Sequence, residues 1–376
     1  MSHPHAAPEG ATLTLGTAAD LAGPADGLRR TIRLSMSGMY RRAAPRAVDT
    51  AGLDGGLRDK LRETYATVDQ PYGALHCHVL SGALVTGHGS VVTSGGVVLR
   101  ETAAGAVPAG FAADAAGGGL RLLAPPSRRI AAPSLLLKAP GWRDPRHALT
   151  EGAAALALAA RLPLTGAWQI VTGQHDHAPA QQALVALCAQ LAPGVPVVGL
   201  PDSETWQFDE LLLIAPLHGP AQFHHPDGLN SLRALRQTGL LAKPSPPRRL
   251  FVRQGAHPAA LLDNEAELAE LAAGRGFDLI DPAQQDQTSL ARLFRAAAFV
   301  AGAPCRAMVN LLFCASGAQC LLLSPGDHPD PFFWDMAAHA GAGFSELFGA
   351  PTARGHAAGH NPYRIDPERF LAMLPK

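Results

Sequence analysis

Apolar and polar positions follow two different patterns along this chain. Between residues 74 and 125 the apolar runs are short, and glycine-rich turns such as Ser94-Gly95-Gly96 separate them. Short apolar runs bounded by turn residues are typical of β-strands. The pattern predicts strands at 74–80, 83–85, 90–93 and 97–101, with a further strand at the leucine run 135–137. Residues 2–27 carry few long apolar side chains and are expected to form a loose lead-in, whereas 53–67 has helical spacing.

From about residue 142 the pattern changes to an alternation of helix and strand. In the first half it predicts helices at 146–161 and 181–191 and strands at 168–172, 195–200 and 210–215. After residue 248 it predicts strands at 249–253, 277–280, 299–301 and 320–323, and helices at 264–274, 289–297 and 307–316. Such alternation implies parallel strands joined by helical crossovers, and therefore an α/β fold.

The length of 376 residues favours about two domains. The clearest linker is the proline-rich run 243–247, because proline is excluded from helix interiors and from central strands. We therefore predict a lead-in at 1–73, an N-terminal domain at 74–242 with a β-rich start, a linker at 243–248 and a C-terminal domain at 249–376.

Charge and cysteine content narrow the function classes. Lys and Arg together number 31, as do Asp and Glu, so the formal net charge is zero, which argues against a broad nucleic-acid interface. The pairs Arg128-Arg129 and Arg248-Arg249 are interpreted as solvated loops. Five cysteines without a CxxC pair fit buried thiols in a reducing compartment, and no zinc pattern is present.

The N-terminal sequence MSHPHAAPEG lacks the pattern of a signal peptide, and no run of about 18 apolar residues predicts a transmembrane helix. These features favour a cytoplasmic protein and leave a peripheral membrane role open.

Candidate ligand-binding residues of the second half follow its predicted strands. Ligands of an open parallel sheet bind beyond the carboxyl ends of the strands, where helix N-termini offer free N–H groups to phosphate. Arg253 ends one such strand, Gly302 and Arg306 lie in the turn after another, and Ser324 follows the last. A guanidinium at such an edge can bind a diphosphate through paired hydrogen bonds, although a surface arginine at a strand end is an equal interpretation for Arg253.

In the first half, His147 and Glu151 are four residues apart on a predicted helix and so share a face. A histidine beside a carboxylate can serve as a general base, and an ordinary surface pair is the alternative. The trio His175-Asp176-His177 could bind a metal, but a polar loop is favoured. Cys305 is interpreted as a packing residue, and His224-His225 as structural or solvated.

Residues 249–325 resemble the C-terminal half of glycosyltransferase family 61, the capsular-polysaccharide type. The resemblance lies in a strand ending in arginine (250–254), Asn264-Glu265 opening a helix, a Gly-Phe strand (276–282), a helix at 289–297, and a run from Val300 to Phe313 that includes Asn310. Upstream, His147 and Glu151 match the His and the acid of the family's helix-start motif, without its aromatic residue. In order and spacing the resemblance covers about residues 74–335, and this chain looks like a divergent member.

The resemblance implies a GT-B-like fold, in which two Rossmann-like domains face each other across a cleft, preceded here by the β-rich leader. It implies inverting, metal-independent transfer of a sugar from a nucleotide-sugar donor, with no cofactor, to a saccharide or glycolipid acceptor in surface or capsular polysaccharide synthesis. His147 and Glu151 are then the base candidates, and the donor-side residues are Arg253, Asn264, Glu265, Gly302, Arg306, Asn310 and Ser324.

Four sites depart from the family pattern. Gln254 replaces the second arginine of a pair, Pro258-Ala259-Ala260 replaces the basic residues that usually follow, Pro304-Cys305 replaces a His-Gly, and Leu322 stands where the final strand usually has Glu. These departures weaken the case for standard donor binding and give a second hypothesis, that the chain is a non-catalytic relative acting as a binding or scaffold subunit of a polysaccharide-synthesis complex. A third hypothesis, an NAD-dependent enzyme, is disfavoured because no GxGxxG follows a strand.

Overall fold

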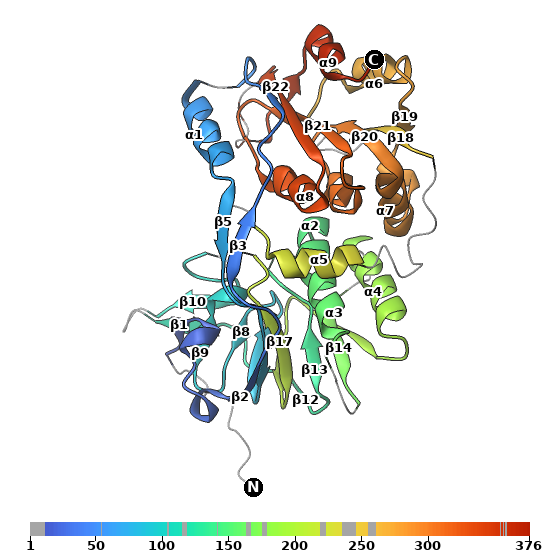
Figure 1. Cartoon of the computed structure of the whole chain (residues 1–376). Coiled ribbons are helices and arrows are strands. Elements are labelled where there is room, and N and C mark those ends of the chain that lie inside the picture. The colour runs from blue at the N-terminus through green and yellow to red at the C-terminus, as the bar shows by residue number, and fades with distance from the viewer. Residues whose placement is uncertain are drawn as a thin grey trace. The chain divides into compact units, whose positions relative to one another are not determined.

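The computed structural model describes residues 12–53, 55–103, 105–114, 119–140, 142–162, 167–174, 179–218, 223–234, 246–254, 261–353, 355, 357 and 359–376. The chain divides into two compact units (Figure 1). One comprises residues 1–38 and 73–219, and the other residues 39–72 and 220–376. The domains expected from the sequence are consecutive segments of the chain, whereas each unit here combines two separate segments. The predicted domain boundaries stay a prediction.

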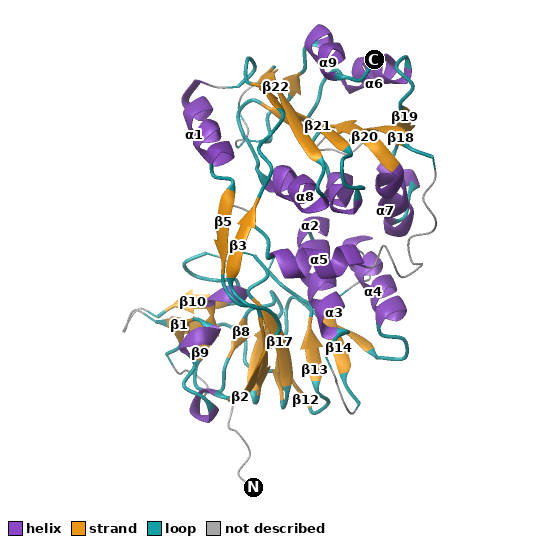
Figure 2. Ribbon diagram, in the orientation of Figure 1, coloured by secondary structure: helices purple, strands orange, loops and turns teal. Residues whose placement is uncertain are grey.

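Within its described residues, the first unit contains two six-stranded sheets and a small hairpin (Figure 2). The first sheet has the order β1 (Thr14–Gly16), β9 (Val97–Leu99), β8 (Val91–Val92), β7 (Ala83–Thr86), β16 (Thr205–Phe208) and β12 (Arg128–Ile130). The second has the order β15 (Val197–Leu200), β14 (Gln169–Gly173), β13 (Ser134–Leu136), β17 (Leu211–Ala215), β6 (His76–Leu80) and β2 (Leu28–Arg33). The hairpin pairs β10 (Phe111–Ala113) with β11 (Leu120–Leu122).

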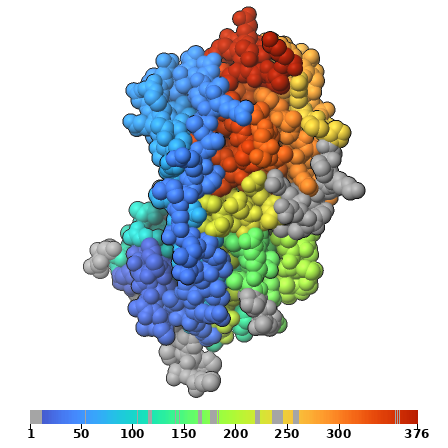
Figure 3. Space-filling model, in the orientation of Figure 1, coloured from blue at the N-terminus to red at the C-terminus, as the bar shows by residue number. Residues whose placement is uncertain are grey.

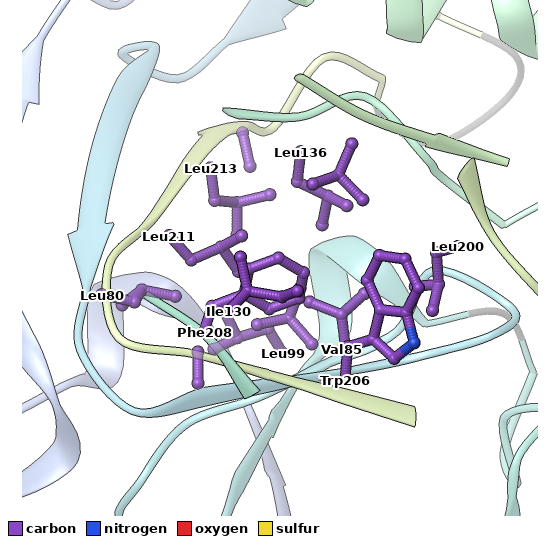
Figure 4. Close-up of a cluster of buried hydrophobic side chains, with 14 of the residues drawn as sticks. Leu80, Val85, Leu99, Ile130, Leu136, Leu200, Trp206, Phe208, Leu211 and Leu213 are labelled. Atoms are coloured by element: carbon purple, nitrogen blue, oxygen red, sulfur yellow. The ribbon is translucent and has the colours of Figure 1, made fainter. Parts of the chain in front are cut away.

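The core of this unit lies between the two six-stranded sheets (Figure 4). Leu136, Val171 and Leu213 of one sheet pack in the same cluster as Val85, Trp206 and Phe208 of the other. Strand β7 illustrates how one strand contributes to two clusters, because successive side chains of a strand point to opposite faces of the sheet. Ala83 and Val85 join this central cluster, while Leu84 joins the cluster that includes Phe111 and Leu120 of the hairpin.

The α-helices of the first unit come after strands of the second sheet in the chain. Strands β13, β14, β15 and β17 are parallel to one another, as the alternation predicted. After β13 come α2 (Pro145–His147), a π-helix (Ala148–Ala153) and α3 (Ala154–Ala159), and after β14 comes α4 (Pro179–Leu191). Short 3₁₀ turns lie at Ala18–Asp20, Pro24–Asp26 and Arg100–Thr102. One continuous helix at 146–161 was expected, and the π-helical turn is a departure from it.

The second unit is a parallel sheet with helices along it. Its order is β19 (Asp278–Ile280), β18 (Arg248–Val252), β20 (Ala297–Gly302), β21 (Gln319–Pro325), β22 (Gly343–Pro351) and β23 (Tyr363–Arg364), and β4 (Ala47–Asp49) also pairs with β22. All neighbours are parallel except β22 with β23. The helices are α5 (Pro226–Ala234), α6 (Glu265–Ala273), α7 (Gln287–Ala296), α8 (Phe332–Ala340) and α9 (Pro367–Met373), with 3₁₀ helices at Pro282–Gln284 and Arg306–Phe313.

Local sequence signals account for several of these elements. Asp286 accepts a hydrogen bond from the Ser289 N–H at 2.6 Å and caps α7, and Asp366 caps α9 in the same way, with Pro367 at its first position. Phe251, Leu321 and Leu323 lie in one cluster with Leu268 of α6 and Phe370 of α9. Helices therefore cover the sheet as the α/β pattern predicted, although the α-helix expected at 307–316 is a 3₁₀ helix.

Residues 39–72 pack into the second unit. They form β4, α1 (Gly55–Ala66), and two strands that pair with each other, β3 (Gly38–Arg41) and β5 (Asp69–Tyr72). In Figure 3 this blue segment lies against the red C-terminal part of the chain, in agreement with the Trp334 indole N–H, which donates to the Ala43 carbonyl at 2.8 Å. Residues 14–16, expected to be loose, instead form β1 in the first unit.

The fold class is therefore α/β, as predicted. The GT-B arrangement of the two units stays a prediction. Among the described residues, no helix is both long and apolar enough to cross a membrane.

Candidate functional site

Three parallel strands of the first unit are followed by ionisable side chains. Lys138 follows β13, Asp202 follows β15 and His218 follows β17. The carboxyl ends of parallel strands meet at one edge of a sheet, and this edge is where open α/β sheets bind ligands.

His147 and Glu151 lie on the helical segment after β13. The His147 Nδ1 and the Glu151 Oε1 are 2.5 Å apart, and the His218 Nδ1 lies 3.6 Å from the same oxygen. Glu151 is buried, whereas the side chains of His147 and His218 are 41% and 48% exposed. Two solvent-accessible imidazoles therefore share one buried carboxylate.

Glu151 lies in the π-helical turn Ala148–Ala153 and His147 directly precedes it. Single π-turns inside helices occur frequently at functional sites. The hydrogen bond to Glu151 raises the pKa of His147, and partial burial opposes that shift. An imidazole paired with a carboxylate in this way can accept a proton and hold the resulting charge.

Glu151 and His218 line a small cavity together with Lys138, Glu101 and the apolar ends of β13 and β17. Its volume is about 40 Å³, which accommodates water and no sugar ring. Pro140 lines both this cavity and a larger one of about 330 Å³ next to it.

Lys138 is the buried cation of this edge. Its Nζ donates to the Leu200 carbonyl at 2.7 Å and to the Asp202 Oδ1 at 2.9 Å, and it lies 4.6 Å from the centre of the Trp142 ring. Burial lowers the pKa of Lys138, and the bond to Asp202 opposes the shift. Asp202 also accepts from the Arg143 Nη2 at 2.7 Å, so its carboxylate balances two cations.

Small residues let these loops approach closely. A Cβ on Gly173 would lie 2.2 Å from the Trp142 ring, and one on Gly87 would lie 2.1 Å from the Asp202 carbonyl oxygen. Both positions thus need glycine, because Trp142 packs against Gly173 and the backbone of Asp202 packs against Gly87.

In the second unit, Arg253 lies next to a carboxylate. Its Nε is 3.7 Å from the Glu265 Oε2, and its side chain is 43% exposed. The other oxygen of Glu265 accepts from the Gln254 N–H at 2.5 Å. The Gln254 side chain donates to the Pro304 carbonyl at 3.1 Å and accepts from the Leu261 and Leu262 N–H groups. At the end of β18, the Gln254 N–H and side chain are thus already hydrogen-bonded within the protein, the N–H to Glu265.

Four other donor-side candidates have internal roles. The Asn264 side chain is bonded to both the N–H and the carbonyl of Ile365, and Asn310 bridges Gln287 and Ala307. Ser324 is buried and donates to Glu346 at 2.5 Å. Gly302 lets β20 approach β18, since a Cβ there would lie 2.6 Å from the Val252 carbonyl oxygen.

Arg306 is exposed at the first position of the 3₁₀ helix that follows β20. Burial raises the pKa of the neighbouring Cys305 thiol to about 11, so the thiol is protonated at neutral pH, as a packing residue would be. Among the donor-side candidates, Arg306 and Arg253 therefore have the most exposed side chains, whereas that of Glu265 is 12% exposed.

Glu346 is a buried acid that the sequence analysis did not select. It accepts hydrogen bonds from Ser324 and from the Tyr65 hydroxyl. Burial raises the pKa of Glu346 from 4.5 to about 7, against the effect of these two bonds.

This shift predicts a pH-dependent stability. The folded-state pKa of Glu346 lies above its unfolded value, so its protonated form stabilises the folded protein. This contribution is complete below about pH 4.5 and is lost as the pH rises through about 7. We expect wild type to lose about 3 kcal/mol of unfolding free energy relative to Glu346→Gln between pH 4.5 and pH 8. Urea unfolding at several pH values measures the difference, and parallel curves for the two proteins would contradict it.

Other sequence candidates lie elsewhere. His175-Asp176-His177 falls outside the described residues, and the part of the chain that is described contains no group of three or more His, Cys, Asp or Glu arranged to hold a metal. His224 is buried and its Nδ1 lies 3.0 Å from the Asp335 Oδ2, which supports the structural interpretation.

The sequence analysis missed Lys138, Asp202 and His218. Each follows a predicted strand by one to three residues. The carboxyl-edge rule, applied to the first half as it was to the second, selects all three.

Parallel sheets with ionisable groups at the carboxyl ends of their strands define an α/β protein of the class that binds ligands at that edge. The family model of Glycosyltransferase 61 matches residues 128–321, just over half of the chain, and the chain belongs to this family. No curated protein matches it significantly.

Proposed function

We propose that this glycosyltransferase-family protein transfers a sugar from a nucleotide-sugar donor to a saccharide or glycolipid acceptor, by inversion and without a metal, in the synthesis of a surface polysaccharide. Family membership supports glycosyl transfer in general. The observation that carries the proposal is the His147–Glu151 pair, with His218 beside it, at the carboxyl edge of the first unit's parallel strands.

In the proposed reaction His147 acts as the base. Its Nδ1 bonds Glu151, so its Nε2 is the nitrogen that takes the proton from an acceptor hydroxyl. The hydroxyl oxygen then forms a bond to the anomeric carbon, and the bond between that carbon and the phosphate oxygen breaks. The nucleoside diphosphate leaves with the electron pair, and Arg253 and Arg306 of the second unit stabilise its charge.

One observation favours the alternative, a catalytically degenerate binding or scaffold subunit. The Glu265 carboxylate holds the Gln254 N–H and faces Arg253. A fixed negative charge at this strand end repels a diphosphate unless Arg253 and Arg306 outweigh it.

Binding of uridine, guanosine and cytidine diphosphates separates the two functions. We expect one of them to raise the melting temperature of the protein, and Arg306→Ala and Arg253→Ala each to remove most of that rise, because a ligand stabilises the state that it binds. Arg58→Ala, at an exposed arginine of α1, serves as the control and should retain it. No shift with any of the three would favour the degenerate subunit.

A further inference from the structure

The larger cavity of the first unit has a defined chemical lining. It lies where the turn between β7 and β8, with His88 and Ser90, meets the segments that follow β13 and β15. The second group contributes Pro140, Trp142, Arg143 and Asp202, and Ala109 completes the lining. Its volume of about 330 Å³ is at the lower end of the range for small-ligand pockets, roughly 300–1,000 Å³, and suits one or two sugar rings.

The carboxylate of this cavity is engaged by cations on both of its oxygens. Both oxygens of Asp202 are engaged, Oδ1 by Lys138 and Oδ2 by Arg143. Lys138 lines the neighbouring small cavity, so Arg143 is the cation of the pair that lines this one. The two acids of the neighbouring small cavity, Glu101 and Glu151, do not line this one.

Arg143 is the accessible cation of the pair. Its side chain is 71% exposed, and its guanidinium carbon lies 5.3 Å from the centre of the Trp142 ring. The bond to Asp202 uses one of the five N–H donors of a guanidinium. The ion pair and the ring both contact the guanidinium, and the geometry of its fork matches a carboxylate or a phosphate.

We propose that this cavity is the acceptor subsite for an anionic sugar, one that carries a carboxylate or a phosphate bound by Arg143. The assignment as acceptor subsite rests on the proposed function, in which His147 and Glu151 are the base candidates. The shared residue Pro140 places the cavity next to the one that Glu151 and His218 line. The preference for an anion rests on Arg143, because its guanidinium lines the cavity and has N–H donors beyond the one that bonds Asp202.

Binding by the full chain, without any donor, tests the subsite. The probes are methyl β-D-glucuronide, glucose 6-phosphate and the neutral methyl β-D-glucoside, titrated by ligand-observed NMR at low salt. We expect at least one anionic probe to bind roughly tenfold or more tightly than the glucoside, because hydrogen bonds to charged groups contribute more than neutral ones. The two anionic arms distinguish a uronic acid from a sugar phosphate.

Two variants locate the site. Arg143→Ala should abolish the preference for the anion, whereas Arg129→Ala should keep it, because Arg129 forms an equally short exposed ion pair with Asp209 outside the cavity. Ala109→Phe should weaken binding of every probe by filling the exposed mouth without touching the core. Circular dichroism checks that each variant is folded.

Equal affinity for neutral and anionic probes, no binding at all, a preference unchanged in Arg143→Ala, or binding unchanged in Ala109→Phe would each overturn the inference. The outcome is separate from that of the proposed function. A protein that binds glucuronide and transfers no sugar retains the subsite and loses the activity, and the reverse result retains the activity and loses the subsite.

Discussion

We expect His147→Ala to lower kcat for sugar transfer by roughly 10²–10⁴-fold, the usual contribution of a positioned general base. We expect a catalytic and not a folding defect, because the His147 side chain is 41% exposed and its hydrogen bond is to Glu151. Steady-state kinetics on the purified variant measures it. His360→Ala, at an exposed histidine of the second unit, is the matched control and should retain full activity.

The pH profile distinguishes a base from a structural residue. The base must be unprotonated, and the bond to Glu151 raises the pKa of His147 above 6.5. The acidic limb of kcat/KM should therefore lie above pH 6.5 in wild type and move to lower pH in Glu151→Gln, which removes the main cause of the shift. A limb that stays in place in Glu151→Gln, or a His147→Ala variant that keeps its activity, would refute the role of this pair.

Replacing Asp335 by alanine is expected to destabilise the protein by about 3–5 kcal/mol, because it leaves the buried Arg42 guanidinium without a counter-charge. Asp335 is fully buried on α8, and its Oδ1 lies 3.6 Å from the Nη1 of Arg42, which is 2% exposed. The Arg42 guanidinium also lies 4.1 Å from the centre of the Trp334 ring, and its Nη2 donates to the Thr67 carbonyl at 3.1 Å. Asp335 accepts from His224 as well.

Chemical denaturation of Asp335→Ala measures the effect, and Asp278→Ala is the control. Asp278 forms a 2.7 Å ion pair with Arg248 in which both side chains are more than a third exposed. Removing an exposed pair typically costs less than about 1 kcal/mol. Similar losses for the two variants would show that the buried cluster around Asp335 is not a stability determinant.

The alternation of apolar runs was sufficient to predict the parallel strands, because local periodicity and short connections determine that pattern. Strands β14, β17, β18, β20 and β21 were all expected near their observed bounds. The pairing of β4 with β22, and of β1 with β9, joins segments far apart in the chain. Local patterns carry no information on such pairings, so residues 47–49 and 14–16 were not predicted as strands.

The candidate site shows the same limit. His147 and Glu151 were predicted to share a helix face because four residues separate them, and their contact is confirmed. His218 reaches Glu151 only because β13 and β17 are adjacent in the sheet. Gln254 was interpreted as a lost arginine, and the contacts of its amide with three backbone groups come from the folded loops alone.

The most direct test is incubation of the full chain with a panel of radiolabelled nucleotide sugars and saccharide acceptors, with detection of labelled product. Our account predicts a labelled saccharide from at least one donor, formed by wild type and lost in His147→Ala. A donor bound by the protein without any product, across every acceptor tried, would contradict sugar transfer by this chain.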